Sequence, residues 1–340
     1  MSFLTSNSRL QRHNSLSNII AKFSDEELFN ILQSATAIHA GIGGTTSMLK
    51  IDGQKVFVKK IALTDLERAP ENFLSTANLF KLPLFYHYRL GSAGFNAWRE
   101  LEAHKQTTDW ALSGACISFP LLYHWRVLEK EKNAALTDSE ATDLRDSVKF
   151  WSNSAAVKNR LEALHSASAN LVLFTEYIPK TLHDWLSAEL EKGGDIADQA
   201  VAMVERECLA VATFFENNQF VHFDAHFNNI LCNGNLFVSD FGLALSSQYN
   251  LEQAEIDFSN KHRTYDRAVC IVSLIQCLLL SLYGPGKWID HLEMFGDSKI
   301  KRPAQITPLI EATIQRYSAI AFVLNDFYQQ LQNGACPEAS

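Results

Sequence analysis

The chain has 340 residues, of which 47% are hydrophobic and 20% are charged, and its formal net charge is −8. This length is enough for two modest lobes with a core each. The acidic balance argues against a protein that binds nucleic acid phosphates over a broad surface, so we expect no nucleic-acid partner. The six cysteines form no CxxC pair, and we expect buried free thiols in the reducing cytoplasm.

The N-terminal residues 1–23 are rich in serine and asparagine and lack the continuous apolar core of a secretory signal. We expect a flexible tail there, with a transit peptide as the less favoured alternative. The longest apolar stretch, 268–283, is interrupted by Ser273 and Gln276 and is too short to cross a bilayer comfortably. It predicts a buried core helix and no membrane span.

The first predicted element follows this tail. Ser24 and Glu27 have the spacing of a capping box, directly ahead of a helical apolar period. A glycine-rich segment, GIGGTTS, then covers residues 41–47 and leads into β-rich sequence on both sides of Asp52-Gly53. This dipeptide predicts a two-residue hairpin turn.

The hairpin turn fixes which residues share a face of the sheet. A two-residue turn at 52–53 sets Met48 opposite Phe57, and the period-2 alternation of a strand puts Lys59 on the face of Phe57. Lys60 points the other way. A slip of one residue would exchange the two lysines, and Lys59 is the favoured one.

The remaining elements divide the chain into a strand-rich first half and a helical second half. We expect an N-lobe over 24–176, interrupted by an irregular insertion at 62–93 and by two surface helices at 129–168, and a helical C-lobe over 177–340. Within these lobes the sequence predicts a helix over 94–110, strands at 119–128 and 170–179, and later helices at 181–191, 197–218, 266–283 and 307–332.

Two polar turns between short apolar strands carry the residue types of a catalytic site. They are VHFDAHFNNIL at 221–231 and SDFG at 239–242. Asn229 and Asp240 offer oxygen ligands of the kind Mg²⁺ takes, and Asp224 can accept a proton from an attacking hydroxyl. Upstream, the glycines of 41–47 bring backbone N–H groups close to phosphates, and Lys59 adds a positive charge.

These segments together resemble the protein-kinase-like superfamily, which includes protein kinases and small-molecule phosphotransferases. The residues 222–229 have the catalytic-loop pattern H-x-D-x-x-x-x-N, and DFG stands at 240–242. GIGGTTSM has two glycines of G-x-G-x-x-G-x-V but Thr46 in the third place, and VFVK has Phe57 where the family usually has alanine. The resemblance covers about residues 38–285.

The resemblance implies an α+β bilobal fold: an N-lobe with an antiparallel sheet and one main helix, a mainly helical C-lobe, and a nucleotide cleft between them. It implies ATP and Mg²⁺ as cofactors, with Asn229 and Asp240 as metal ligands. The implied catalytic residues are Asp224, Lys59, Glu100, Asn229 and His226, and the implied nucleotide-binding residues are Gly41, Gly43, Gly44, Met48, Phe57, Lys59, Thr175, Glu176 and Ile178.

Two residue assignments stay open within this resemblance. Glu100 and Glu102 lie about 200° apart on one predicted helix, so only one of them can face Lys59; Glu100 is favoured. His226 occupies the place where many protein kinases have lysine, and either contacts the γ-phosphate or packs. His222 is expected to orient the backbone, and Asp266 resembles the structural aspartate that begins a buried C-lobe helix.

Three functions are compatible with these residues. The favoured one is an atypical Ser/Thr protein kinase, because DFGLA and the segment before Pro179 resemble protein kinases. The second is a small-molecule kinase similar to aminoglycoside and choline kinases, because the stretch between Gly242 and Asp266 is short and has no A-P-E. The third is a nucleotide-binding pseudokinase, which the joint presence of the lysine and the metal-binding residues disfavours. The acceptor is therefore a protein or a small-molecule hydroxyl.

Overall fold

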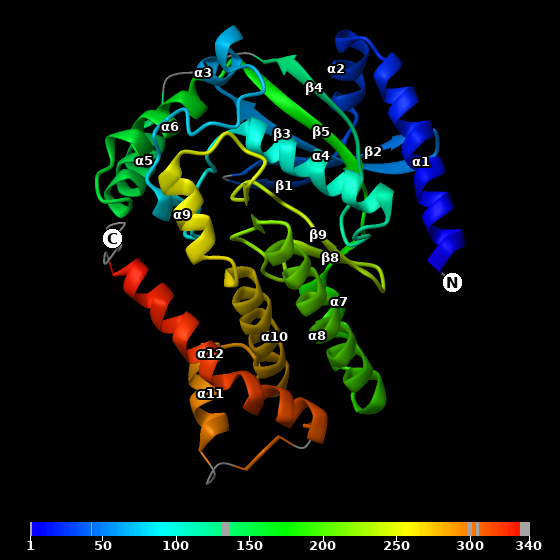
Figure 1. The fold of residues 1–340 in the computed structure, drawn as a ribbon, viewed down its shortest axis with the longest axis vertical. Helices are drawn as coiled ribbons and strands as arrows, with labels where there is room; N and C mark the ends of the chain where they lie inside the picture. The colour runs from blue at the N-terminus through cyan, green and yellow to red at the C-terminus, as the bar shows by residue number, and fades with distance from the viewer. Residues whose placement is uncertain (1, 42, 131–135, 298–300, 304–305, 334–340) are drawn as a thin grey trace. The chain divides into compact units, whose positions relative to one another are not determined.

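The structure is a computed structural model that describes residues 2–41, 43–130, 136–297, 301–303 and 306–333. It is an α+β protein with two compact units (Figure 1). The first unit holds the chain up to Ile178 together with Asp240–Phe258, and the second holds Pro179–Ser239 and the chain from Ser259. The chain first passes between units at Ile178–Pro179, two residues beyond the predicted boundary after 176. The placement of 240–242 in the second unit was wrong, because Asp240–Phe258 packs into the first.

The first unit is built on a five-stranded antiparallel sheet of order β1-β2-β3-β5-β4. Its strands are β1 (Thr36–Gly41), β2 (Gly44–Ile51), β3 (Gln54–Leu63), β4 (Leu122–Glu129) and β5 (Ala169–Glu176). The predicted hairpin is confirmed: Met48 pairs with Phe57, and both turn residues have positive φ, 49° at Asp52 and 72° at Gly53. A turn with two positive φ values matches the twist of the flanking strands.

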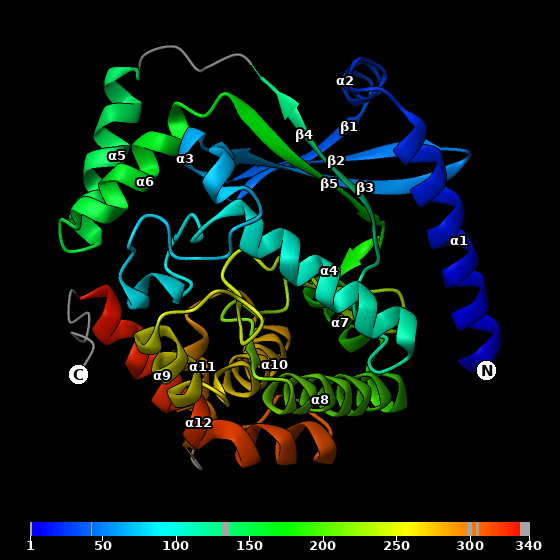
Figure 2. The same ribbon diagram turned by 45° about the horizontal axis from the view of Figure 1, so that its top comes forward.

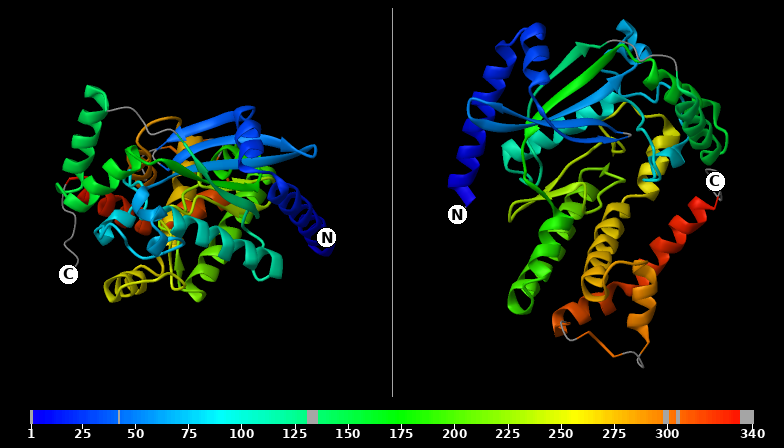
Figure 3. Two further views of the ribbon diagram at one scale, coloured as in Figure 1. Left: turned by 90° about the horizontal axis from the view of Figure 1, so that it is seen from above. Right: turned by 180° about the vertical axis from the view of Figure 1, so that it is seen from behind.

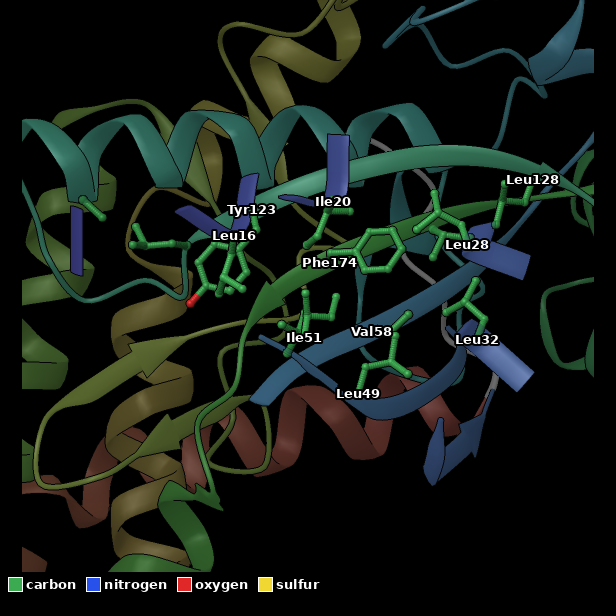
Figure 4. Close-up of a cluster of buried hydrophobic side chains, with 14 residues drawn as sticks. Leu16, Ile20, Leu28, Leu32, Leu49, Ile51, Val58, Tyr123, Leu128 and Phe174 are labelled. Atoms are coloured by element: carbon green, nitrogen blue, oxygen red, sulfur yellow. The ribbon is translucent and has the colours of Figure 1, made fainter. Parts of the chain in front are cut away.

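One face of this sheet is covered by α1 (Ser2–Lys22) and α2 (Asp25–Gln33). The capping box of Ser24 and Glu27 is confirmed at the start of α2. Leu16 and Ile20 of α1 are fully buried in a cluster that includes Phe174 of β5 (Figure 4). The prediction of a flexible tail over 1–23 is therefore wrong: the i, i+4 spacing of two apolar residues, among polar neighbours, forms a narrow core-facing stripe.

The opposite face of the sheet is covered by α4 (Ala97–Ser113), the predicted helix over 94–110 (Figure 2). Asn96 caps its first turn, and Gly114 ends it in the left-handed region at φ 77°. Trp98 and Leu101 pack against odd-numbered residues of β5, such as Leu173, whereas even-numbered ones face α1 and α2. This is the alternation of a strand buried on both faces.

The two predicted insertions are present. The first, at 62–93, contains α3 (Asp65–Arg68) and two short 3₁₀ helices, Pro70–Asn72 and Leu84–His87. The second, at 129–168, contains the two predicted helices, α5 (Asp138–Phe150) and α6 (Ala155–His165), which lie side by side (Figure 3).

The second unit is mainly helical, as predicted. It has a small antiparallel sheet of order β6-β8-β9 and the helices α7, α8, α10, α11 and α12. Including the short strand β7, the elements of this unit are β6 Lys180–Thr181, α7 Leu182–Leu190, α8 Gly194–Asn217, β7 Phe220–Val221, β8 Ile230–Cys232, β9 Leu236–Val238, α10 Tyr265–Tyr283, α11 Trp288–Gly296 and α12 Pro308–Gln332. The sequence did not predict α11. It also did not predict β10 (Leu245–Ser246) or α9 (Gln253–Lys261), which precede α10 in the chain.

Within the described part of the chain, α10 is the one helix with the length and hydropathy of a membrane span. Its most apolar window is 61% buried inside the protein, where it contacts α7, α8, α11 and α12. This packing confirms the predicted core helix, because an apolar helix buried by its neighbours needs no lipid.

Candidate active site

The first part of the candidate site is an ion cluster around Lys59. The lysine Nζ donates to Glu100 Oε1 at 2.6 Å and to Asp240 Oδ1 at 2.8 Å. Lys59 and Glu100 are 6% and 4% exposed, whereas the Asp240 side chain is 45% exposed. Lys59 lies on the predicted face of the sheet, and its partner is Glu100, which the sequence favoured over Glu102. Glu102 instead pairs with Lys105 at 2.7 Å.

The ion cluster contains two carboxyl groups, those of Glu100 and Asp240, and one ammonium group, that of Lys59. Burial by itself lowers the pKa of Lys59, but the carboxylates of Asp240 and Glu100 outweigh it and raise the pKa above its ordinary value. Burial raises the pKa of Glu100 to about 7, against the opposing effect of Lys59. Two carboxylates thus share one ammonium group. Asp240 is the more exposed of the two carboxylates.

The glycine-rich turn lies directly against this lysine. A Cβ on Gly43 would be 3.6 Å from Lys59 Nζ, an ordinary contact distance. Gly44 has φ 119°, and a Cβ there would be 2.2 Å from the carbonyl oxygen of Lys60, so only glycine fits. Of the predicted glycine positions, Gly43 thus lies beside the ammonium group, Gly41 lies beside the His39 ring, and Gly44 lies against the main chain of Lys60. Ile42 between them lies outside the described residues.

Asp240 begins a sharply bent segment. Its φ is 62°, in the left-handed region that costs free energy for a residue with a Cβ. The next residue, Phe241, is fully buried, with its ring 4.9 Å from that of His104 and 6.4 Å from that of Phe119. A Cβ on Gly94 would be 2.7 Å from the carbonyl oxygen of Gly242. Close packing on both sides holds the strained aspartate in place.

The residues after this bend are anchored by the 62–93 insertion. His87 Nδ1 lies 2.9 Å from the carbonyl oxygen of Leu243, and Thr76 Oγ1 accepts the N–H of Asn250 at 2.8 Å. Lys81 forms an ion pair with Glu252. From the sequence, this insertion was compatible with shaping a substrate site, docking a partner or only covering the N-lobe. The structure shows that it holds the segment that begins with Asp240.

The helix α4 anchors the same segment from the other side. Arg99, next to Glu100, forms an ion pair of 2.7 Å with Glu255, and both side chains are 2% exposed. The main chain of Arg99 accepts a hydrogen bond of 2.8 Å from the Tyr249 hydroxyl, and Gln106 accepts one of 2.9 Å from Ser246. Sequence reasoning missed Arg99 and Glu255, since nothing local distinguishes them from solvated helix charges.

The predicted adenine-binding residues lie at the end of β5 and opposite it. Phe57 pairs with Thr175 across β3 and β5, and Thr175 and Ile178 are 4% and 7% exposed. The N–H of Glu176 donates to the carbonyl oxygen of Leu121 at 2.8 Å, so it is occupied within the protein. The Glu176 carboxylate accepts from Arg9 of α1 at 2.6 Å, a contact that the prediction of a tail excluded.

The second part of the candidate site is the loop at 222–229. Asn229 Nδ2 donates to Asp224 Oδ2 at 2.8 Å and to its main-chain oxygen at 3.1 Å. His226 Nε2 lies 3.4 Å from Asp224 Oδ1. The three predicted residues of this loop are therefore in mutual contact, and the Asp224 side chain retains 20% of its exposure.

The main chain of this loop is held by the buried Asp266 of α10. Its carboxylate accepts the N–H groups of His222 at 2.6 Å and Phe223 at 2.9 Å, and Phe223 has φ 64°. Burial raises the pKa of Asp266 to about 7, against the two N–H bonds that lower it. The buried carboxylate thus stabilises a strained turn directly before Asp224. The structural role predicted for Asp266 is confirmed.

His222 orients the main chain, as predicted. Its Nδ1 accepts the N–H of Asp224 at 3.2 Å, so the proton is assigned to Nε2, which donates to the carbonyl oxygen of Ser239 at 3.0 Å. Ser239 in turn donates its N–H and its hydroxyl to the carbonyl oxygen of Asn229, at 2.9 and 2.8 Å. Ser239 immediately precedes Asp240 in the chain.

Among the described residues, no group of three or more His, Cys, Asp or Glu side chains is placed to hold a metal ion. Mg²⁺ is commonly bound through one or two protein carboxylates together with substrate phosphates, so a sparse donor set fits it better than it fits zinc. The Asp240 carboxylate, with its side chain 45% exposed, is a donor of the type that Mg²⁺ takes. No model of a known protein family matches this chain, and no curated protein matches it.

Proposed function

We propose that the protein is an ATP- and Mg²⁺-dependent phosphotransferase of protein-kinase-like fold that acts on a hydroxyl acceptor in the cytoplasm. The observation that carries the proposal is the buried Lys59–Glu100 pair, joined to Asp240 beneath a glycine turn. A buried ion pair is a weak source of stability, because desolvation offsets the attraction between its charges. A buried lysine held by two carboxylates beside a glycine turn is therefore better explained by a function than by stability.

Lys59, oriented by Glu100, would hold phosphate oxygens of the nucleotide, and the turn Gly41–Gly44 would cover them. The ammonium group stays protonated because the two carboxylates raise its pKa. The adenine would pack against Met48 and Phe57, with Thr175 and the main chain of 176–178 at its edge. A lysine held at two points loses little side-chain freedom when it binds phosphate, which favours affinity.

Asn229 and Asp240 would hold the Mg²⁺ ion. When bound, the ion neutralises the negative charge that develops on the transferred phosphoryl group. Asp224 would orient the acceptor hydroxyl and take its proton. The hydrogen bond from Asn229 fixes one carboxylate oxygen of Asp224, and His226 lies beside the other. His226 would therefore set the charge around the base.

For the acceptor, the sequence favours a protein hydroxyl, and one structural observation favours a small molecule instead. Leu243, Ala244, Leu245 and Ser246 are buried, as are Tyr249 and Glu255 further along. Side chains anchored in this way are not available to line a docking platform for an extended peptide. A compact alcohol needs no such platform, so a small-molecule kinase is the second candidate.

The deciding experiment incubates the protein with γ-labelled ATP and Mg²⁺, separately with generic protein substrates and with a panel of hydroxyl-bearing metabolites. Label on protein supports the kinase of Ser/Thr type, and label on small molecules alone supports the second candidate. Tight nucleotide binding without any transfer supports the pseudokinase hypothesis and contradicts the proposed activity. The Asp224→Ala variant serves as the background control.

A further inference from the structure

The strand β1 places a histidine in the same row as Lys59. His39 pairs with Thr46 across β1 and β2, and Thr46 pairs with Lys59 across β2 and β3. Directly opposite residues in antiparallel strands have their side chains on the same face of the sheet. His39, Thr46 and Lys59 therefore share the face that α4 covers further along, where Glu100 meets the lysine.

A break in the strand register puts His39 on this face. The pairing shifts between Ala37, which lies opposite Ser47, and His39, which lies opposite Thr46, so that Ile38 has no cross-strand partner. Without this irregularity, period-2 alternation would turn His39 to the opposite face. Bulges of this kind re-aim a side chain and occur frequently beside active sites. The Thr46 hydroxyl donates a hydrogen bond of 3.3 Å to the carbonyl oxygen of His39. This bond stabilises the shifted register of β1.

The imidazole of His39 and the ammonium group of Lys59 each lie beside a glycine of the same turn. A Cβ on Gly41 would be 2.8 Å from His39 Nε2, and one on Gly43 would be 3.6 Å from Lys59 Nζ. Gly41 therefore leaves space that the imidazole uses. Lys59 already has two carboxylate partners, whereas His39 is exposed, in contrast to the buried histidines of the core.

We propose that His39 is a second nucleotide-binding residue, which contacts the polyphosphate together with Lys59 under the glycine turn. This inference rests on the proposed function. An imidazole N–H donates a hydrogen bond to a phosphate oxygen. Thr46, in the place of the third glycine, stabilises the strand irregularity that aims His39 rather than binding phosphate itself.

The test compares His39→Ala and His39→Gln with wild type in calorimetric binding of Mg²⁺–ATP, Mg²⁺–tripolyphosphate and adenosine. We expect His39→Ala to weaken the binding of ATP and tripolyphosphate by about tenfold, as for one hydrogen bond to a charged group. His39→Gln, which retains a donor, should lose less. Adenosine binding should not change, because adenosine has no phosphate.

Thr45→Ala is the matched control, since Thr45 lies in the same hairpin but pairs with Lys60 on the other face. It should bind all three ligands as wild type does. Equal ATP and tripolyphosphate binding by wild type and His39→Ala would overturn the role of His39 and leave the proposed function intact. A parallel loss of adenosine binding would show that His39 only supports the fold. Wild-type protein that binds neither phosphate ligand would overturn the proposed function itself.

Discussion

The two parts of the candidate site are assembled in opposite ways. The ion cluster joins Lys59 to Glu100 and Asp240, which lie 41 and 181 residues away in the chain. The loop at 222–229 joins Asp224, His226 and Asn229, which lie within six residues of one another. In the ion cluster the side chains of Lys59 and Glu100 are almost fully buried, whereas in the loop at 222–229 the side chains of Asp224 and His226 are partly exposed.

This difference shows what each part depends on. The ion cluster requires β3, α4 and the 240–258 segment to pack together, so changes far from Lys59 should reach it. The loop at 222–229 requires local hydrogen bonds and the two hydrogen bonds that the buried carboxylate of Asp266 accepts. Changes elsewhere in the fold should leave it intact unless they reach α10.

The largest expected effect separates chemistry from binding. Asp224→Ala should lower the rate of phosphate transfer by about 10²–10⁴-fold, the usual contribution of a positioned base, while it keeps nucleotide affinity. Asp240→Ala should weaken Mg²⁺–ATP binding as well, because Asp240 is a proposed metal ligand. Single-turnover transfer assays and calorimetry measure the two effects. An Asp224→Ala protein that transfers phosphate at the wild-type rate would show that this assignment is wrong.

The next effect tests whether a distant change reaches the ion cluster. Glu255→Gln leaves Arg99 buried and uncompensated, which should cost about 3–5 kcal/mol of unfolding free energy. ATP affinity should fall with it, because Arg99 and Glu100 are neighbours on α4. Urea denaturation followed by fluorescence measures the stability.

Glu252→Gln is the control for Glu255→Gln. It removes an ion pair with Lys81 in which both side chains are exposed, and such pairs contribute about 0–1 kcal/mol. Equal stability of the two variants would contradict the anchoring of the 240–258 segment through Arg99.

The third effect tests whether the first unit depends on its N-terminal helix. Leu16→Ala removes a side chain that is 1% exposed, and should lower the unfolding free energy by about 2–5 kcal/mol. Ser15→Ala, at the exposed neighbouring position, should change it by less than about 0.5 kcal/mol. If denaturation curves of Leu16→Ala and wild type coincided, α1 would not be part of the core.

The smallest effect concerns Asp266, whose carboxylate holds the loop at 222–229. The pKa of Asp266 is raised to about 7 from an ordinary value of 3.8, so the folded protein binds its proton more tightly than the unfolded chain. Its contribution to stability is therefore full below about pH 4 and is lost as the pH rises through 7. One proton accounts for a slope of at most about 1.4 kcal/mol per pH unit.

Asp266→Asn should flatten the decline in unfolding free energy between about pH 4 and 7 relative to wild type. Glu100 has the same sign of pKa shift, so a part of the slope should persist in the variant. Urea titrations at four pH values measure the difference. Parallel slopes in the two proteins would show that Asp266 does not titrate in this range.

Local patterns in the sequence determined much of this protein. The capping box at Ser24, the register of the 52–53 hairpin and the face of Lys59 follow from residues close together in the chain. The same holds for the contacts within 222–229, since four intervening residues cannot separate Asp224 and Asn229 far. Short-range geometry is set by backbone dihedrals and hydrogen bonds, which adjacent residues specify.

Only the tertiary structure decided the rest. The choice of Glu100 over Glu102 depends on which side of α4 meets the sheet, and the burial of α1 depends on a sheet surface built from residues 49–174. The grouping of 240–258 with the first unit required the partners Arg99 and His87, more than 150 residues earlier. Free energy from such contacts appears only when distant segments have packed, so no local pattern carries it.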